Sequence, residues 1–261
     1  MPEGEPLSPA EAVVLLAPNL LKGSDAVKVT LLLLLTTGVL RIEKSEVPGI
    51  FGSKKVAHLR IVAEPKNPSA EIAAVLSVVR AAQPEGGKIS DVVKHAEKTF
   101  AAGCPLFSTN FIMPTLIARG LVTKKKLWFS FIFRLTPEGE AAQARIKSDL
   151  LKADDVARLV KSDPAQAAAI AATLGTNILL SGKLTKQFKP LADAMRAHSG
   201  GGGDVLILTG GDTNHAHVGG FDLGSLGHFD LGCLSAGAVD ALHSGIGSFD
   251  AGFGDGGGHH H

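Results

Sequence analysis

The sequence predicts an α+β fold that is mainly α, followed by a helical segment and a glycine-rich tail. Two observations predict the fold: the order helix, glycine, β-hairpin occurs twice, and helical periodicity covers much of the remaining chain before residue 199. A third observation sets the tail apart, because the composition changes after Arg196. With 261 residues, 45% of them hydrophobic, the chain is long enough for one or two compact domains with real cores.

The clearer hairpin lies between Ala118 and Ala142. Gly120 is predicted to end a helix, since glycine readily adopts the left-handed conformation found just past helix ends. Residues 121–135 then contain two apolar runs around three lysines. The second run alternates with period two, which predicts a strand with its phenylalanines facing inward. Thr136 is predicted to cap the next helix, with Pro137 in its first turn. This order of elements is that of a winged helix.

An earlier stretch repeats the order. A helix ends at Gly38, a strand follows, and residues 56–62 form the return strand after a turn that contains Pro48, Gly49, Gly52, Lys54 and Lys55. Gly38 and Gly120 are 82 residues apart, so we expect two tandem winged-helix-like domains, at residues 1–64 and 65–148. A helical segment at 149–198 and the tail at 199–261 complete the predicted organisation.

Local signals place the other helices. Ser8 begins a capping box ahead of the first apolar run. Ser90 is predicted to cap a helix over 91–101, and Pro114 lies in the first turns, or at a kink, of the helix before the second hairpin. We expect further helices over residues 72–82, 138–151, 154–161, 165–180 and 184–196.

Parts of the sequence resemble known families. The wording "RGLV…LTPEGEAAQARI" resembles the wing of MarR-type regulators, in which a capped helix also follows the wing. The stretches "DAVKVTLLLLLTTGVLRIEKSE", "AEIAAVLSVVRAA" and "LIARGLV", with the glycine-rich end, resemble an uncharacterised bacterial family. That family has paired winged-helix-like segments and a glycine-rich tail, and its members are usually membrane-anchored. A weaker likeness, on the glycine before the first hairpin, is to the phosphoinositide-binding Golgi-phosphoprotein family.

Charge is distributed unevenly along the chain. The whole sequence carries a net charge of +1, but residues 1–196 carry +8, and the remainder carries −7 with no Lys or Arg. A basic body could bind a polyanion, or the acidic tail could occupy the same surface as a tether. Two cysteines, Cys104 and Cys233, do not make a disulfide framework in a chain of this length, and we see no signal peptide. We therefore expect a reducing, cytoplasmic setting.

Neither long uncharged run that we identify predicts a membrane span. Residues 29–40 are too few to cross a bilayer. Residues 164–182 are longer but include polar side chains such as Gln166 and Asn177, which favours a packing helix.

The helices before the two hairpins are poor candidates for reading DNA bases, which usually requires Arg, Lys, Asn or Gln side chains. The first, over 25–37, offers only Lys28 and a run of five leucines that must be buried on every side. The second, over 108–119, offers Ser108, Thr109, Asn110 and Arg119.

The hairpins instead carry candidate polyanion-binding residues: Lys54, Lys55, Lys124, Lys125, Lys126 and Trp128. The lysines could neutralise phosphates of nucleic acid or anionic lipid, and the indole could stack on a base or enter a membrane surface. Alternatively, the lysines are solvated charges that keep the turns soluble, and Trp128 packs on the neighbouring copy.

The tail contains candidate interaction motifs. Phenylalanine followed by aspartate occurs three times, as Phe221-Asp222, Phe229-Asp230 and Phe249-Asp250. These pairs could act as stickers in a disordered segment or as short strands in self-association. A transition metal at His215, His217, His228 and Cys233 is a minor alternative, because no established metal-binding spacing is present. We expect no cofactor.

No catalytic signature stands out, since the glycine-rich stretches lack the Lys-Ser/Thr of a phosphate loop. The sequence therefore predicts a non-enzymatic interaction or scaffold protein that forms homo-oligomers or binds another protein through its tail. The alternatives are a winged-helix DNA-binding transcriptional regulator and a peripheral membrane protein that binds anionic lipid through a basic-aromatic hairpin.

Overall fold

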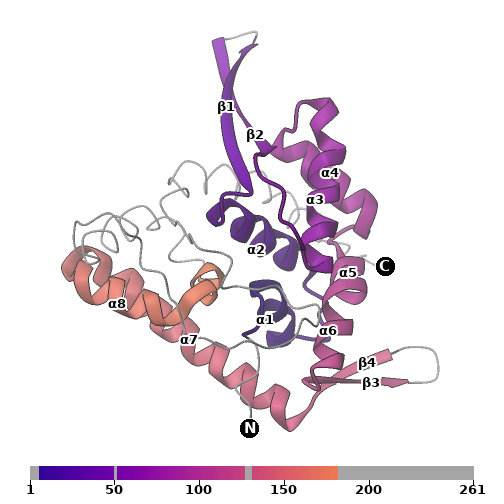
Figure 1. Cartoon of the computed structure of the whole chain (residues 1–261), viewed down its shortest axis with the longest axis vertical. Coiled ribbons are helices and arrows are strands. Elements are labelled where there is room, and N and C mark those ends of the chain that lie inside the picture. Colours follow the sequence, from indigo (N-terminus) through magenta and orange to yellow (C-terminus); the bar gives the residue numbers. More distant parts are fainter. Residues whose placement is uncertain (1–5, 50–51, 127–130, 182–261) are drawn as a thin grey trace, which may run out of the picture.

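The computed structural model describes residues 6–49, 52–126 and 131–181 (Figure 1). Within these ranges the chain is mainly helical, with two small antiparallel sheets of two strands each. The predicted fold class, α+β and mainly α, is confirmed at this level. The predicted helix over 184–196 and the whole tail lie outside the described residues.

The first segment consists of α1 (Pro9–Leu16), α2 (Gly23–Thr36), β1 (Leu40–Gly49) and β2 (Gly52–Ile61). The capping box at Ser8 is confirmed, because its hydroxyl accepts a hydrogen bond from the Glu11 amide at 3.2 Å and its amide donates to the Glu11 carboxylate at 2.8 Å. The hairpin is longer than predicted, since pairing continues to Gly49 and Gly52. The residues predicted to form its turn therefore lie in the strands.

The second segment consists of α3 (Ala70–Ala82), η1 (Gln83–Glu85), α4 (Ile89–Phe100), α5 (Pro105–Phe107), η2 (Ser108–Ile112), α6 (Met113–Ala118), β3 (Val122–Lys126) and β4 (Phe131–Leu135). The cap predicted at Ser90 is wrong: α4 begins at Ile89, because Lys88 is extended and forms a β-bridge with His58. Pro114 lies in the first turn of α6, directly after a π-helical turn. Proline has no amide hydrogen to donate, so this change of helical register matches the predicted break.

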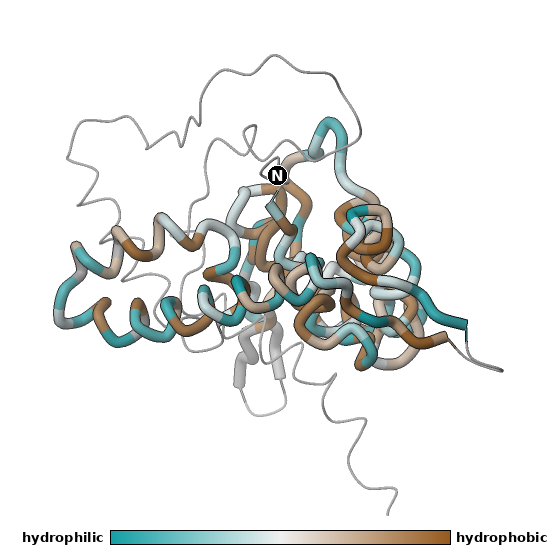
Figure 2. Tube along the Cα trace, turned by 90° about the horizontal axis from the view of Figure 1, so that it is seen from below, coloured by the Kyte–Doolittle hydropathy of each residue, from teal (hydrophilic) through white to brown (hydrophobic). Residues whose placement is uncertain are grey.

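Two helices and a final turn complete the described chain: α7 (Pro137–Ser162), α8 (Pro164–Leu174) and η3 (Gly175–Leu180). The cap at Thr136 is confirmed, since its hydroxyl accepts from the Gly139 amide at 3.0 Å. The prediction of two helices over 138–161 is wrong, because neither glycine nor proline interrupts α7 after Gly139. Hydrophobic and hydrophilic residues alternate along this helical pair (Figure 2). The helix predicted over 165–180 ends early, at Gly175, whose φ is +52°.

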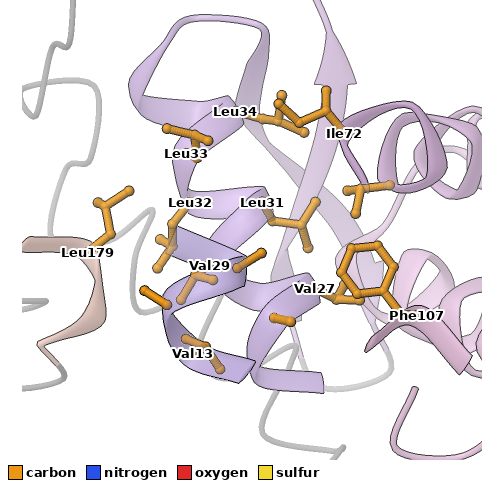
Figure 3. Close-up of a cluster of buried hydrophobic side chains, with 14 of the residues drawn as sticks. Val13, Val27, Val29, Leu31, Leu32, Leu33, Leu34, Ile72, Phe107 and Leu179 are labelled. Atoms are coloured by element: carbon orange, nitrogen blue, oxygen red, sulfur yellow. The ribbon is translucent and has the colours of Figure 1, made fainter. Parts of the chain in front are cut away.

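The core is one continuous cluster centred on α2 (Figure 3). Leucines 31–35 are all buried, as predicted from their placement around the helix. They share the core with Val13 of α1, Ile72 of α3, Phe107 of α5 and Leu179 of η3. Both predicted domains, 1–64 and 65–148, contribute to this cluster, and so does the helical segment that follows. Whether they behave as separate domains stays a prediction.

Each hairpin attaches to the other segment. The β2 strand packs against the segment between α3 and α4, where the Leu59 amide donates to the Gly87 carbonyl at 2.8 Å and the Gln83 side chain donates to the Leu59 carbonyl at 2.7 Å. Reciprocally, the Phe133 amide of β4 donates at 3.1 Å to the side chain of Asn19, which lies between α1 and α2. The two segments are therefore interlocked.

Candidate functional site: the second hairpin and the helix before it

The second hairpin continues directly from the end of α6 and projects from the body (Figure 1). Lys124, Lys125 and Lys126 are exposed along β3. The Lys124 ammonium lies 3.9 Å from the centroid of the Phe131 ring, at cation–π distance. Lysines on an exposed edge strand also discourage pairing with another sheet, so these charges could serve solubility alone.

The prediction that the phenylalanines of this hairpin face inward is only partly right. Phe133 is 7% exposed, but Phe131 is 55% exposed. Both lie on the same face of the strand, so the difference arises because the hairpin extends beyond the body and only its root reaches the core. Trp128, which was predicted to join this site, lies outside the described residues.

The root of the hairpin is held firmly. The Thr136 hydroxyl donates to the Gly120 carbonyl at 2.7 Å, and Asn19 accepts from Phe133. Arg119, at the end of α6, donates to the buried carboxylate of Glu11 at 3.0 Å and forms an ion pair with it. This arginine, predicted as one possible DNA contact, is therefore engaged in fixing α6 to α1.

The continuous helical stretch from α5 through α6 has one solvent face without charge. Its exposed residues include Leu106, Asn110, Pro114 and Ile117, whose spacing of four, four and three residues places them on one side of a helix. Leu106 is 44% exposed and Ile117 is 37% exposed. The sequence holds no charged residue between Lys98 and Arg119. This uncharged run is the signal in the sequence that could have indicated the face, and the motif-based predictions above do not include it.

Of the three other polar residues predicted as possible DNA contacts on this helix, only Asn110 is exposed. Ser108 is buried and has no hydrogen-bond partner within the described residues, and the Thr109 hydroxyl donates to the Pro105 carbonyl at 3.0 Å. Asn110 is exposed. The surface of this helix thus presents one amide, the hydroxyl of Thr115 and several apolar groups.

The first hairpin does not join this site. It projects from the opposite end of the molecule (Figure 1). Lys54 and Lys55 lie in β2, paired in register with Val47 and Glu46, and their side chains fall outside the described part of the structure. The six predicted polyanion-binding residues are therefore divided between two separate hairpins.

One bent pair of helices within the described residues has the length and composition of a membrane span. Across the described ranges, no single helix has both the length and the apolar character needed to cross a bilayer. The pair Ile89–Phe100 and Pro105–Ala118, bent by 61°, passes that test by length and composition. Residues 164–174 form a packing helix, as predicted, with Ala167, Ala171 and Leu174 buried.

His58 of the body takes part in hydrogen bonds that hold the fold together, and the thiol of Cys104 is buried. His58 lies 2.7 Å from both the Ser45 hydroxyl and the Gly86 carbonyl, which fixes β2 to the loop before α4. Burial, together with the nearby charge of Glu97, raises the pKa of Cys104 to about 12, so its thiol stays protonated near neutral pH and is a poor nucleophile.

No group of three or more metal-binding side chains occurs among the residues described in the structure. The tail residues predicted to bind a metal (His215, His217, His228 and Cys233) or a partner (the three Phe-Asp pairs) lie outside those residues.

No family model, curated protein or solved structure matches the chain. The resemblances drawn from local motifs therefore stay hypotheses.

Proposed function

We propose that this chain is a non-enzymatic interaction protein that associates through its tail. The observation that carries the proposal is the uncharged, partly apolar solvent face of α5–α6, at the position where a DNA-binding protein would present donors. An exposed apolar face flanked by basic residues is typical of a surface that binds another polypeptide. The distinct composition of residues 199–261 supports a separate role for the tail.

We propose further that the body consists of two winged-helix-like units that exchange their hairpins. The order of helix, positive-φ glycine and antiparallel hairpin occurs twice, at Gly38 and at Gly120. In a winged helix, a short strand between the first two helices pairs with the wing. Two contacts support such an exchange: His58 of β2 forms an isolated β-bridge with Lys88, and the Phe133 amide of β4 donates to the side chain of Asn19. Each hairpin is thus bonded to a loop of the other segment.

Base-specific DNA binding has less support. The helix before the first hairpin, α2, is buried in the core. On the helix before the second hairpin, Arg119 is paired with Glu11 and Asn110 is the exposed amide. A regulator that used the two hairpins would hold DNA through phosphate contacts alone, without reading sequence.

A second candidate function is peripheral binding to an anionic membrane, favoured by the placement of Lys124 over the exposed ring of Phe131. A cation next to an aromatic ring suits the interface between headgroups and acyl chains. The test is co-sedimentation of the full chain with vesicles of phosphatidylcholine containing phosphatidylserine. Binding that is lost in K124E/K125E/K126E would support this function, and failure to co-sediment would remove it.

The main proposal is tested by sedimentation velocity of the full chain and of a chain that ends at residue 198. We expect the full chain to form concentration-dependent assemblies and the shortened chain to remain monomeric, with an unchanged circular dichroism spectrum. Assemblies of the same size in both proteins would contradict the proposal.

A further inference from the structure

Two neighbouring parts of the body, the helical stretch α5–α6 and the hairpin that follows it, supply the two kinds of group that the tail motifs would need. We call this region the hairpin–helix surface, and it consists of Leu106, Asn110, Pro114, Ile117, Lys124, Lys126 and Phe131, with Lys125 on the opposite face of the hairpin. The helix residues supply an uncharged apolar face, and the hairpin that leaves the end of α6 supplies three ammonium groups. An aromatic ring next to a carboxylate would find a partner for each group there.

The three hairpin lysines are consecutive on one short strand and, unlike several cations of the body, take part in no ion pair among the described residues. Over the described ranges, Arg60, Arg80, Lys94, Lys152 and Arg158 each form an ion pair with an aspartate or glutamate. No salt bridge in those ranges includes Lys124, Lys125 or Lys126. The hairpin therefore holds a local excess of positive charge that no neighbouring carboxylate of the described body neutralises.

The tail has the complementary composition. Residues 197–261 contain seven aspartates and neither lysine nor arginine, whereas the body carries +8. Three of those aspartates directly follow a phenylalanine, at positions 222, 230 and 250. Each motif thus places a carboxylate beside a ring, in a segment of opposite charge to the surface.

The link between body and tail is long enough. The described chain ends at Ser181, just after η3, which packs against α1 and α7, and α1 in turn contacts α6. From Ser181 to Phe221 there are 40 residues, which could span up to ~130 Å if fully extended. Tethering also gives the motifs a high effective concentration at the surface, on the order of millimolar for short links.

We propose that the Phe-Asp motifs of this chain's own tail bind the hairpin–helix surface, in the same chain or in a neighbouring copy. The aspartates pair with Lys124 and Lys126, Lys125 on the opposite face adds to the local positive charge, and the phenylalanine rings pack on Phe131 and Ile117. This inference rests on the proposed function, to which it adds the site on the body that receives the tail.

The experiment uses the full chain and measures the rate of chymotrypsin cleavage after Phe221, Phe229 and Phe249 by mass spectrometry. Each rate is divided by the rate for the isolated peptide 199–261 of the same sequence, which removes the effect of the residue after the cleaved bond. On this scale the hairpin variant K124E/K125E/K126E and the tail variant D222K/D230K/D250K should each be cleaved about tenfold faster than the natural chain, a loss of roughly 1.4 kcal/mol in docking. The variant that combines both sets restores opposite charges and should regain protection. A control, K66E/K98E/K161E, makes the same change of net charge on exposed lysines elsewhere and should be cleaved like the natural chain.

Protection that is independent of protein concentration would place the contact within one chain, and protection that rises with concentration would place it between copies; either supports the proposal. Unchanged cleavage in the hairpin variant, or no recovery in the combined variant, would overturn it. If the shortened chain loses assembly while the hairpin variant keeps both assembly and protection, the proposed function stands and this inference alone fails. Loss of vesicle binding in the hairpin variant with unchanged cleavage would assign the surface to a membrane instead.

Discussion

Helix α2 and the stretch α5–α6 stand in equivalent places and have opposite surroundings. Both lead to a glycine of positive φ, +72° at Gly38 and +70° at Gly120, and both are followed by an antiparallel hairpin. Yet α2 is packed by α1, α3, α5, β1 and η3, whereas α5–α6 keeps one face in solvent. The comparison teaches that the same order of helix, glycine and hairpin can occur twice in different surroundings. The distribution of apolar residues around each helix determines whether the helix is buried or keeps a face in solvent.

The strongest test of this contrast is to shorten one side chain on each helix. Leu31→Ala removes a buried side chain from the centre of the core and should lower the free energy of unfolding by about 3 kcal/mol. Ile117→Ala, on the partly exposed face, should cost less than about 1 kcal/mol. Urea unfolding followed by circular dichroism measures both. Equal losses would show that the two helices are equally buried.

Glycines at the two helices provide the next test. A Cβ on Gly23, at the start of α2, would lie 1.7 Å from the Cys104 carbonyl oxygen, so the backbones must separate. Gly23→Ala should therefore destabilise the protein by about 2–3 kcal/mol. A Cβ on Gly120 meets nothing within 4 Å, so Gly120→Ala should cost only the left-handed backbone strain, about 1 kcal/mol. Thermal unfolding of both variants ranks them, and the reverse order would contradict this close approach.

The ion pair at the end of α6 should have an intermediate effect. Arg119→Gln removes a charged partner of the buried Glu11 and should cost about 2 kcal/mol. Because the same change loosens α6 and the root of the hairpin, hydrogen exchange at Phe133 should quicken. If the variant is less stable but hydrogen exchange at Phe133 is unchanged, the ion pair does not help to hold the hairpin in place.

The cysteine at the start of α5 should make the free energy of unfolding depend on pH above neutrality. Burial raises the pKa of Cys104 from 9.0 to about 12, so the unfolded chain loses this proton first as pH rises. The stabilisation linked to this thiol is complete below pH 9 and should decline between pH 9 and 12, by at most about 1.4 kcal/mol per pH unit. Cys104→Ala should flatten this decline in urea unfolding between pH 9 and 11, and an unchanged slope would argue against burial of the thiol.

Features set by neighbouring residues were predictable from the sequence. The caps at Ser8 and Thr136 and the helix ends at Gly38 and Gly120 each depend on a hydrogen bond or a backbone angle within a few residues. The burial of leucines 31–35 follows from their spacing alone.

Features set by distant contacts were not predictable. The start of α4 at Ile89 depends on a bridge to His58, and the exposure of Phe131 depends on how far the hairpin extends beyond the body. The uncharged face of α5–α6 could have been anticipated from the run between Lys98 and Arg119, but which of its residues meet solvent depends on packing against α1 and α4.

The contacts of each hairpin with the other segment also constrain how the protein folds during synthesis. The hydrogen bond between Asn19 and Phe133 joins residues 114 apart in the chain. The loop between α1 and α2 therefore gains this contact only after the second hairpin has been synthesised. During synthesis, a nascent chain that has emerged only as far as residue 64 can form its own hairpin but lacks the loop against which β2 packs. Contacts of such long sequence separation slow folding. A cell that makes this protein must therefore keep α1 and the apolar helix α2 from aggregating until roughly the first half of the chain has left the ribosome.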